Sequence, residues 1–134
     1  MRIVLDTNIL ISALFFGGKP KTILDYIVDG KIIAFVSREI IEEYKEVVDR
    51  INILKNGSIS IDLLLNLFTL INVVSDIKIC RDKDDDKFIN CAIDSKSLYV
   101  VSGDNDLLVI KRYKDITIIS ADDFLKQLNI YVMN

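Results

Sequence analysis

Short apolar runs alternate along the chain with longer segments in which apolar residues recur every three or four positions. The runs "RIVLD", "IIAFV", "LYVVS" and "ITIIS", which begin at residues 2, 32, 98 and 116, are typical of buried strands. Helices are expected at residues 8–16, 21–29, 38–51, 60–71, 84–96 and 121–128, with a helical turn at 104–110 and an extended piece at 77–80. Strands that alternate with helices predict an α/β fold with a parallel sheet covered on both faces.

Helical periodicity separates the acidic residues of the segment 38–51. Ser37 is a suitable N-cap for this helix. The apolar stripe consists of Ile40, Tyr44, Val47, Val48 and Ile51, and the opposite, solvent face carries Glu39, Glu42, Glu46 and Asp49. Glu43 lies at the border of the stripe, three residues after Ile40 and four residues before Val47. Its carboxylate is therefore expected to reach whatever the apolar face packs against.

The stretch "RDKDDDKF" (81–88) holds four aspartates, and the same geometry distinguishes them. Asp85 precedes the apolar residues Phe88, Ile89 and Ala92 by three, four and seven positions, so it shares their face if the helix extends that far. Asp86 is rotated roughly 120° from the centre of that face. Asp82, Asp84 and Asp86 are better explained as loop and helix-start residues, which are favourable near the positive end of a helix dipole.

Two further acids, Asp6 and Asp104, follow predicted strands. Ligands of parallel sheets bind beyond the carboxyl ends of the strands, so Asp6, Glu43, Asp85 and Asp104 are expected to converge at one edge. Four carboxylates close together repel one another and raise one another's pKa values. A divalent cation relieves this repulsion, and ligands that are all oxygen favour Mg²⁺ or Mn²⁺ over zinc.

The amino-acid composition limits the kinds of catalytic, metal-binding and nucleic-acid-binding site that the chain can have. The chain has 134 residues, 51% of them hydrophobic and 28% charged, which predicts a single domain spanning 1–134. It has no histidine, which excludes histidine-based catalysis and imidazole zinc sites within the chain. The net charge of −3 argues against binding nucleic acid by broad electrostatic attraction alone. Short apolar runs, the absence of a signal-peptide core and only two cysteines, Cys80 and Cys91, favour a cytoplasmic protein with no membrane span and with both thiols as packing residues.

The four acids stand in segments that resemble the motifs of PIN-domain ribonucleases, the family that includes the VapC-type toxins of toxin-antitoxin pairs. "IVLDTNILISAL" resembles the opening motif, and "SREIIEEYKEVV" resembles the second, in which the acid follows a serine by six residues. "RDKDDDKFINCAI" is similar to the third motif and "LYVVSGDNDLL" to the fourth, while "ITIISADDFLKQL" is like the closing strand and helix. The resemblance covers nearly the whole chain in the right order.

This resemblance implies a three-layer α/β/α sandwich around a central parallel sheet of about four to five strands. It also implies that Asp6, Glu43, Asp85 and Asp104 are catalytic residues and ligands of Mg²⁺ or Mn²⁺. Thr7, Asn8 and Ser102 would shape the site, and Asp106 would be an outer ligand. Lys83 stands where many relatives carry proline, and a shift of one residue in the third motif keeps Asp86 as a reserve candidate.

The function that the resemblance implies is a metal-dependent endoribonuclease acting on RNA, as the toxin of a toxin-antitoxin pair, with an antitoxin partner and a homodimeric state. The basic residues considered as guides for the strand are Lys19, Lys21, Arg38, Lys111 and Arg112. Two alternatives stay open: a PIN-like module that binds RNA or a partner without cutting, and a haloacid-dehalogenase-like phosphatase. The phosphatase usually needs a second aspartate two positions after the first, where this chain has Asn8.

Overall fold

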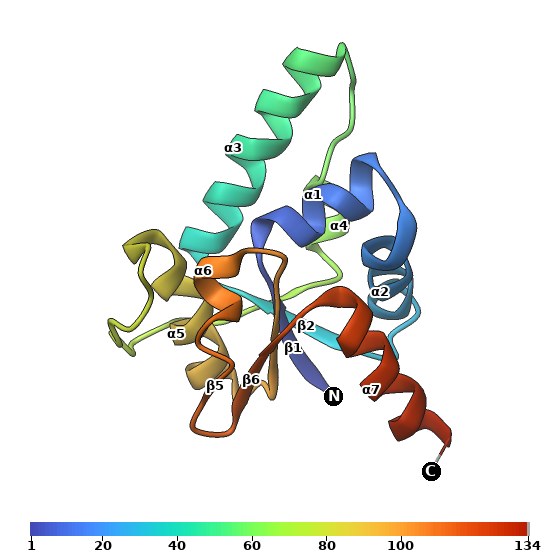
Figure 1. Ribbon diagram of the computed structural model, residues 1–134. Helices are drawn as coiled ribbons and strands as arrows, with labels where there is room; N and C mark the ends of the chain where they lie inside the picture. Colours follow the sequence, from blue (N-terminus) through green and yellow to red (C-terminus); the bar gives the residue numbers. More distant parts are fainter. Residues whose placement is uncertain (134) are drawn as a thin grey trace.

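The computed structural model describes residues 1–133, with side chains described as far as residue 129, so residue 134 of the expected domain lies outside it (Figure 1). Six strands form one sheet in the order β3-β2-β1-β4-β6-β5. They are β1 (Arg2–Leu5), β2 (Ile33–Val36), β3 (Thr69–Leu70), β4 (Tyr99–Val101), β5 (Arg112–Tyr113) and β6 (Ile116–Ile119). All neighbouring strands are parallel except β5 and β6, so the predicted parallel α/β sheet is confirmed, with an antiparallel edge hairpin added.

The helices are α1 (Thr7–Phe15), α2 (Gly18–Val28), α3 (Arg38–Lys55), α4 (Asp62–Leu65), α5 (Asp86–Ser95), α6 (Asn105–Leu108) and α7 (Ala121–Met133), and a 3-10 turn, η1, spans Lys83–Asp85. Helices α1, α2 and α7 lie on one side of the sheet and α5 on the other, while α3 extends away from the carboxyl edge (Figure 1). The helices thus form the outer layers expected for an α/β/α sandwich. No helix of the described residues is long and apolar enough to cross a membrane.

The core consists of the apolar residues of the strands and of the buried faces of the helices. Val4, Ala34 and Val100, at the centres of β1, β2 and β4, are completely buried because parallel strands are covered on both faces. On α3, Ile40, Tyr44 and Val48 are buried, and Glu39, Glu42, Glu46 and Asp49 are exposed as predicted.

The helix expected at 60–71 is wrong. The structure has only the four-residue α4 there, followed by a turn and the two-residue strand β3. Thr69 and Leu70 pair with Phe35 and Val36, because β2 offers unpaired backbone groups at its open edge. Strand pairing, which local periodicity cannot reveal, decides the conformation of this segment.

Candidate active site

Asp6 is fixed by the junction between β1 and α1. It is the N-cap of α1, and its Oδ1 accepts a hydrogen bond from the N–H of Ile9 at 2.9 Å. Its Oδ2 accepts a hydrogen bond from the hydroxyl of Ser102, which follows β4. Capping explains why an aspartate ends the buried strand, since the first N–H groups of a helix need an acceptor. The two bonds hold a buried carboxylate at the carboxyl edge of the sheet.

Asp104 belongs to the same hydrogen-bond network. The hydroxyl oxygen of Ser102 accepts from the N–H of Asp104 at 2.9 Å, and Oδ1 of Asp104 accepts from the N–H of Asp106 at the same distance. Asp104 is thereby the N-cap of α6. Ser102 links the two acids because one hydroxyl can donate to Asp6 while it accepts from Asp104.

Helix α3 presents Glu43 to this edge, and Tyr44 determines how the helix is anchored there. The buried hydroxyl of Tyr44 donates to the carbonyl oxygen of Leu5 at 2.6 Å, one residue before Asp6. The Glu43 carboxylate accepts hydrogen bonds from the hydroxyl of Thr7 and, at 2.9 Å, from the amine of Lys87. Glu43 is half-buried, as its border position predicted.

Asp85 reaches the same place from the opposite side. It ends the 3-10 turn η1 rather than opening a helix, because α5 begins one residue later. Its Oδ2 is buried and has no hydrogen-bond partner among the residues that the structure describes. A buried polar atom without a partner is costly, so it points to a ligand at this position.

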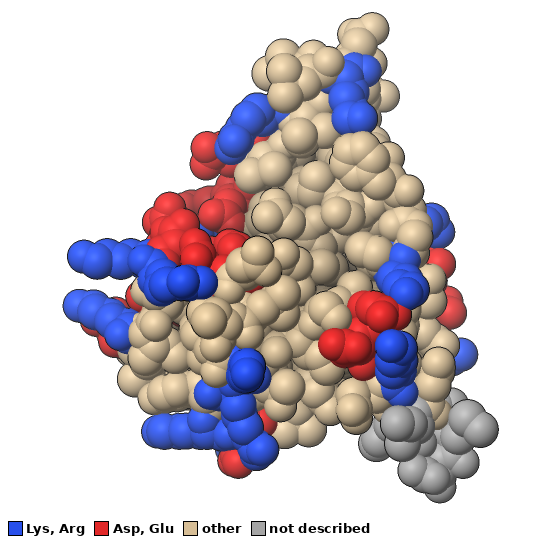
Figure 2. Space-filling view, viewed as in Figure 1, with Lys and Arg blue, Asp and Glu red and all other residues tan. Residues whose placement is uncertain are grey.

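These side chains line one depression of about 230 Å³. The residues that line it are Asp6, Thr7, Asn8, Glu43, Val47, Arg50, Asp85, Phe88 and Asp104. All four acids singled out by the sequence are among them. Figure 2 shows acidic side chains gathered beside α3 and α6, with basic side chains projecting beyond them.

Burial and the neighbouring charges raise the pKa values of two of these acids. Burial raises the pKa of Asp6 to about 6, against the hydrogen bonds from Ser102 and Ile9 and with the charge of Asp104. Burial and the charge of Asp104, followed by those of Asp82 and Asp6, raise the pKa of Asp85 to about 7. Paired carboxylates with raised pKa values are typical of functional sites.

The other candidates of the sequence lie in different surroundings. Thr7 and the exposed Asn8 line the depression, and Ser102 lies behind Asp6 without lining it. Asp106 forms an ion pair with Arg81, whose Nε lies 3.2 Å from Oδ1. Asp86, the reserve candidate, does not line the depression.

Three residues at the site were not expected from the sequence: Tyr44, Arg50 and Lys87. Tyr44 looked like one more apolar residue of its stripe, although a buried tyrosine hydroxyl usually needs a partner, which was the available signal. The Lys87 side chain is only 6% exposed and donates both to Glu43 and, at 2.6 Å, to the carbonyl oxygen of Asp84. A lysine inside an acidic stretch gives no sign in the sequence of being buried.

The donor chemistry of the depression fits a hard divalent cation. The four acids, with Thr7 and Asn8, offer oxygen ligands, and the buried Oδ2 of Asp85 lacks a partner among the described residues. No three acidic or cysteine side chains within residues 1–133 are arranged to hold a metal ion as they stand. In this structure the carboxylate of Asp6 is bonded by Ser102, and that of Glu43 by Thr7 and Lys87.

Comparisons with known proteins agree with this arrangement. A family model described as "PIN domain" matches residues 2–106, which include all four acids. A protein of Methanocaldococcus jannaschii named "Uncharacterized protein MJ1680" is 34% identical over 118 residues, which is 83% of this chain and 76% of that protein. The chain therefore belongs to the PIN-domain family, whose fold is that of nucleases.

Proposed function

We propose that the protein is a metal-dependent endoribonuclease whose centre is formed by Asp6, Glu43, Asp85 and Asp104. The observation that carries the proposal is the convergence of these acids, from the ends of β1 and β4, from α3 and from η1, in one depression. Packing alone does not explain four neighbouring carboxylates, because the burial of a carboxylate without partners costs free energy. RNA is taken as the substrate from the family, since no residue of the depression is assigned to a 2′-hydroxyl.

Each carboxylate has a distinct role in this proposal. Asp6 and Asp104 are held in place through Ser102. Glu43 is oriented by Thr7 and Lys87. Asp85, whose Oδ2 has no hydrogen-bond partner among the described residues, would be the carboxylate most available to a bound cation. All four would hold Mg²⁺ or Mn²⁺, which supplies an acidic bound water and stabilises charge on the phosphate.

The test is cleavage of a mixed single-stranded RNA with Mg²⁺ or Mn²⁺, for the wild type, Asp85→Asn and Asp84→Asn. Asp84 is exposed and lies in the same turn, so Asp84→Asn removes the same charge without touching the depression. We expect cutting to need metal, to stop with a chelator and to be lost only in Asp85→Asn.

Two outcomes of this assay would contradict the proposal. Equal trace activity in all three proteins would indicate contamination, and the chain would then be a binding module that does not cut. Hydrolysis of a small phosphomonoester in place of RNA would favour the phosphatase.

We further propose, from the family, that the protein is a toxin neutralised by an antitoxin and that it forms a homodimer in the cytoplasm. An antitoxin would cover the acidic depression, so it should suppress cleavage when the two proteins are produced together. Failure of a neighbouring small gene product to co-purify would count against the toxin role. Light scattering of the purified protein tests the homodimer.

A further inference from the structure

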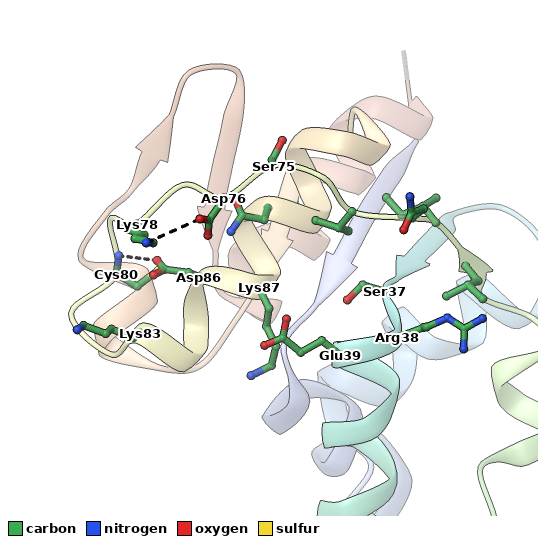
Figure 3. Close-up of a pocket in the computed structure, with 15 residues that line it drawn as sticks. Ser37, Arg38, Glu39, Ser75, Asp76, Lys78, Cys80, Lys83, Asp86 and Lys87 are labelled. Atoms are coloured by element: carbon green, nitrogen blue, oxygen red, sulfur yellow. Dashed lines mark hydrogen bonds and ion pairs between the residues drawn. The ribbon is translucent and has the colours of Figure 1, made fainter.

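A second, larger cavity of about 950 Å³ lies beside the acidic depression at the same edge of the sheet (Figure 3). It lies beyond the carboxyl ends of β2 and β3, between the first turns of α3 and α5. Its outer wall is the segment 71–82 between β3 and η1, here called the strap. Parallel sheets place their ligand sites at this edge, so the position alone makes the cavity a candidate for binding.

Side chains of α5 hold the strap in place. Oδ1 of Asp86 accepts hydrogen bonds from the N–H groups of Ile79 and Cys80 at 3.1 and 2.9 Å. The amide of Asn90 binds the backbone of Ile77 in both directions, at 2.8 and 3.2 Å. Asp94, one turn further along α5, accepts from the N–H groups that follow Val73. The cavity is thus a maintained feature, because an irregular segment is fixed away from the sheet by buried or half-buried polar groups.

The larger cavity has a mixed lining with one more basic than acidic side chain, whereas acids predominate in the depression. Its basic side chains are Arg38, Lys78, Lys83 and Lys87, and its acidic ones are Glu39, Asp76 and Asp86. Oδ1 of Asp86 accepts two N–H groups of the strap, and Oδ2 of Asp76 lies 3.7 Å from Nζ of Lys78. Within residues 1–133, neither Arg38 nor Lys83 has an ion pair or side-chain hydrogen bond.

The positions of these free cations suit a strand of nucleic acid. Arg38 and Lys83 lie at opposite ends of the cavity in Figure 3. The lining of the cavity also includes the apolar side chains of Leu70 and Val73 and the exposed amide of Asn72. Basic groups position phosphates, and an apolar wall with an amide suits an unpaired base, so a lining of this kind suits single-stranded nucleic acid.

The larger cavity is also connected to the acidic depression. Lys83 opens the same 3-10 turn that ends with Asp85. Lys87 lines the cavity, and its amine bonds Glu43, which lines the depression. A phosphate at Lys83 would therefore be followed along the strand by one at the acids.

We propose that the cavity under the strap binds a short segment of single-stranded RNA that adjoins the scissile phosphate, with separate phosphates at Arg38 and at Lys83 and with a base against the lining side chains Leu70, Asn72 and Val73. The part of this inference that rests on the proposed function is that the bound RNA adjoins a phosphate that the protein cleaves. The binding itself can be measured without cleavage.

The first measurement is the fluorescence anisotropy of a labelled, mixed-sequence single-stranded RNA in the presence of a chelator. We expect the double variant Arg38→Ala/Lys83→Ala to bind about tenfold more weakly, because two phosphate contacts are lost. The control variant Lys31→Ala/Lys126→Ala removes the same charge from exposed lysines away from both cavities. It should bind within about twofold of the wild type, since scattered surface charges contribute little.

A second measurement locates the RNA directly. RNA containing 4-thiouridine should cross-link on irradiation to a peptide from the strap, residues 71–82. In the cleavage assay with metal, the Arg38/Lys83 double variant should raise KM and leave kcat nearly unchanged, because neither residue lines the acidic depression.

The outcomes separate this inference from the proposed function. Wild-type affinity in the double variant, together with cross-links outside the strap, would overturn the inference while metal-dependent cleavage could still stand. Loss of antitoxin binding in the double variant with RNA affinity unchanged would also overturn it, in favour of a protein partner. Weaker RNA binding in the double variant, without cleavage by the wild type, would support the inference and count against the nuclease.

Discussion

Asp85 and Asp86 are neighbours in the sequence but belong to two opposite environments. Asp85 lines the acidic depression, where burial and the charge of Asp104 raise its pKa to about 7. Burial alone would raise the pKa of Asp86 as well, but the N–H groups of Cys80 and Ile79 outweigh it and lower the pKa below its ordinary value. The comparison distinguishes an acid held without enough partners, which is available for function, from one whose partners make it part of the framework.

Lys87 lies between the two environments. Its amine is 2.9 Å from Oε1 of Glu43, and the side chains of the pair are 6% and 30% exposed. A second bond to the carbonyl oxygen of Asp84 ties the turn that carries Asp85 to helix α3. In the metal-free protein this ammonium is therefore the positive charge nearest to Glu43.

The largest expected effects come from removing the carboxylate of Asp85 or that of Asp86. Asp85→Asn should reduce metal-dependent cleavage by about 100-fold or more, because it removes a charged ligand at the reacting centre. The free energy of unfolding of the metal-free variant should stay equal or rise, since a carboxylate without enough partners is removed.

Asp86→Ala should do the opposite to stability. It leaves the N–H groups of Ile79 and Cys80 without their acceptor, which we expect to cost about 2–4 kcal/mol of the free energy of unfolding. Urea denaturation of both variants without metal measures this. Equal stability of Asp86→Ala and wild type would show that the strap does not depend on Asp86.

Lys87→Met removes the cation between the two environments. It leaves Glu43 without its ion pair, and we expect a loss of about 1–3 kcal/mol in the metal-free protein, less than for a completely buried pair because Glu43 is partly exposed. Added Mn²⁺ should raise the melting temperature of this variant more than that of the wild type, since the metal supplies the missing charge. Lys45→Met, which changes an exposed lysine of α3, is the control. Equal shifts in all three proteins would contradict the role given to Lys87.

Tyr44→Phe tests the anchor beneath the acids. The variant loses only the hydroxyl that donates to Leu5 at 2.6 Å, so we expect a cost of about 1–2 kcal/mol by urea denaturation. The bond fixes α3 against β1 beside Asp6, so cleavage should also decrease by a few-fold. Tyr26→Phe removes a hydroxyl from a half-buried tyrosine of α2 that lines neither cavity, and it should change neither quantity.

The sequence was sufficient for the elements that carry their own periodicity. The buried and exposed faces of α3 follow from the spacing of Ile40, Tyr44 and Val48, and the strands that end just before Asp6 and just before Ser102 follow from their apolar runs. For such elements the pattern of burial is the cause of the structure. The family resemblance supplied the order of the motifs, and the match of the PIN-domain family model to residues 2–106 confirms the family.

Contacts between distant segments could not be predicted in this way. The segment 60–71 was assigned to a helix because its pairing with β2 depends on an open edge in space. The helix argument for Asp85 assumed one helix from residue 84, whereas a 3-10 turn precedes α5, and the side chain still lines the depression because the turn carries it there. The ion pair of Lys87 with Glu43 spans 44 positions and depends on how α3 and α5 pack.

The smallest expected effect is the pH dependence of stability, and it follows from the acidic depression alone. The pKa values of Asp6 and Asp85 are about 6 and 7 in the folded protein, against 3.8 for an ordinary aspartate. Between about pH 4 and pH 7 the folded protein therefore binds more protons than the unfolded chain, so the free energy of unfolding rises as the pH falls. Asp86 and Asp94 have lowered pKa values, and their contribution changes only below this window.

The metal-free protein should consequently melt on the order of a few degrees higher near pH 5.5 than near pH 8, as measured by calorimetry with a chelator present. Asp85→Asn should lose the larger part of this slope, because it removes the group with the greater shift. Mg²⁺ should reduce the slope in the wild type, since a cation at the acids stabilises their charged forms near pH 8. A wild-type melting temperature that rises from pH 5.5 to pH 8 would mean that folding does not raise the pKa values of these carboxylates. The contrast drawn between Asp85 and Asp86 would then be wrong.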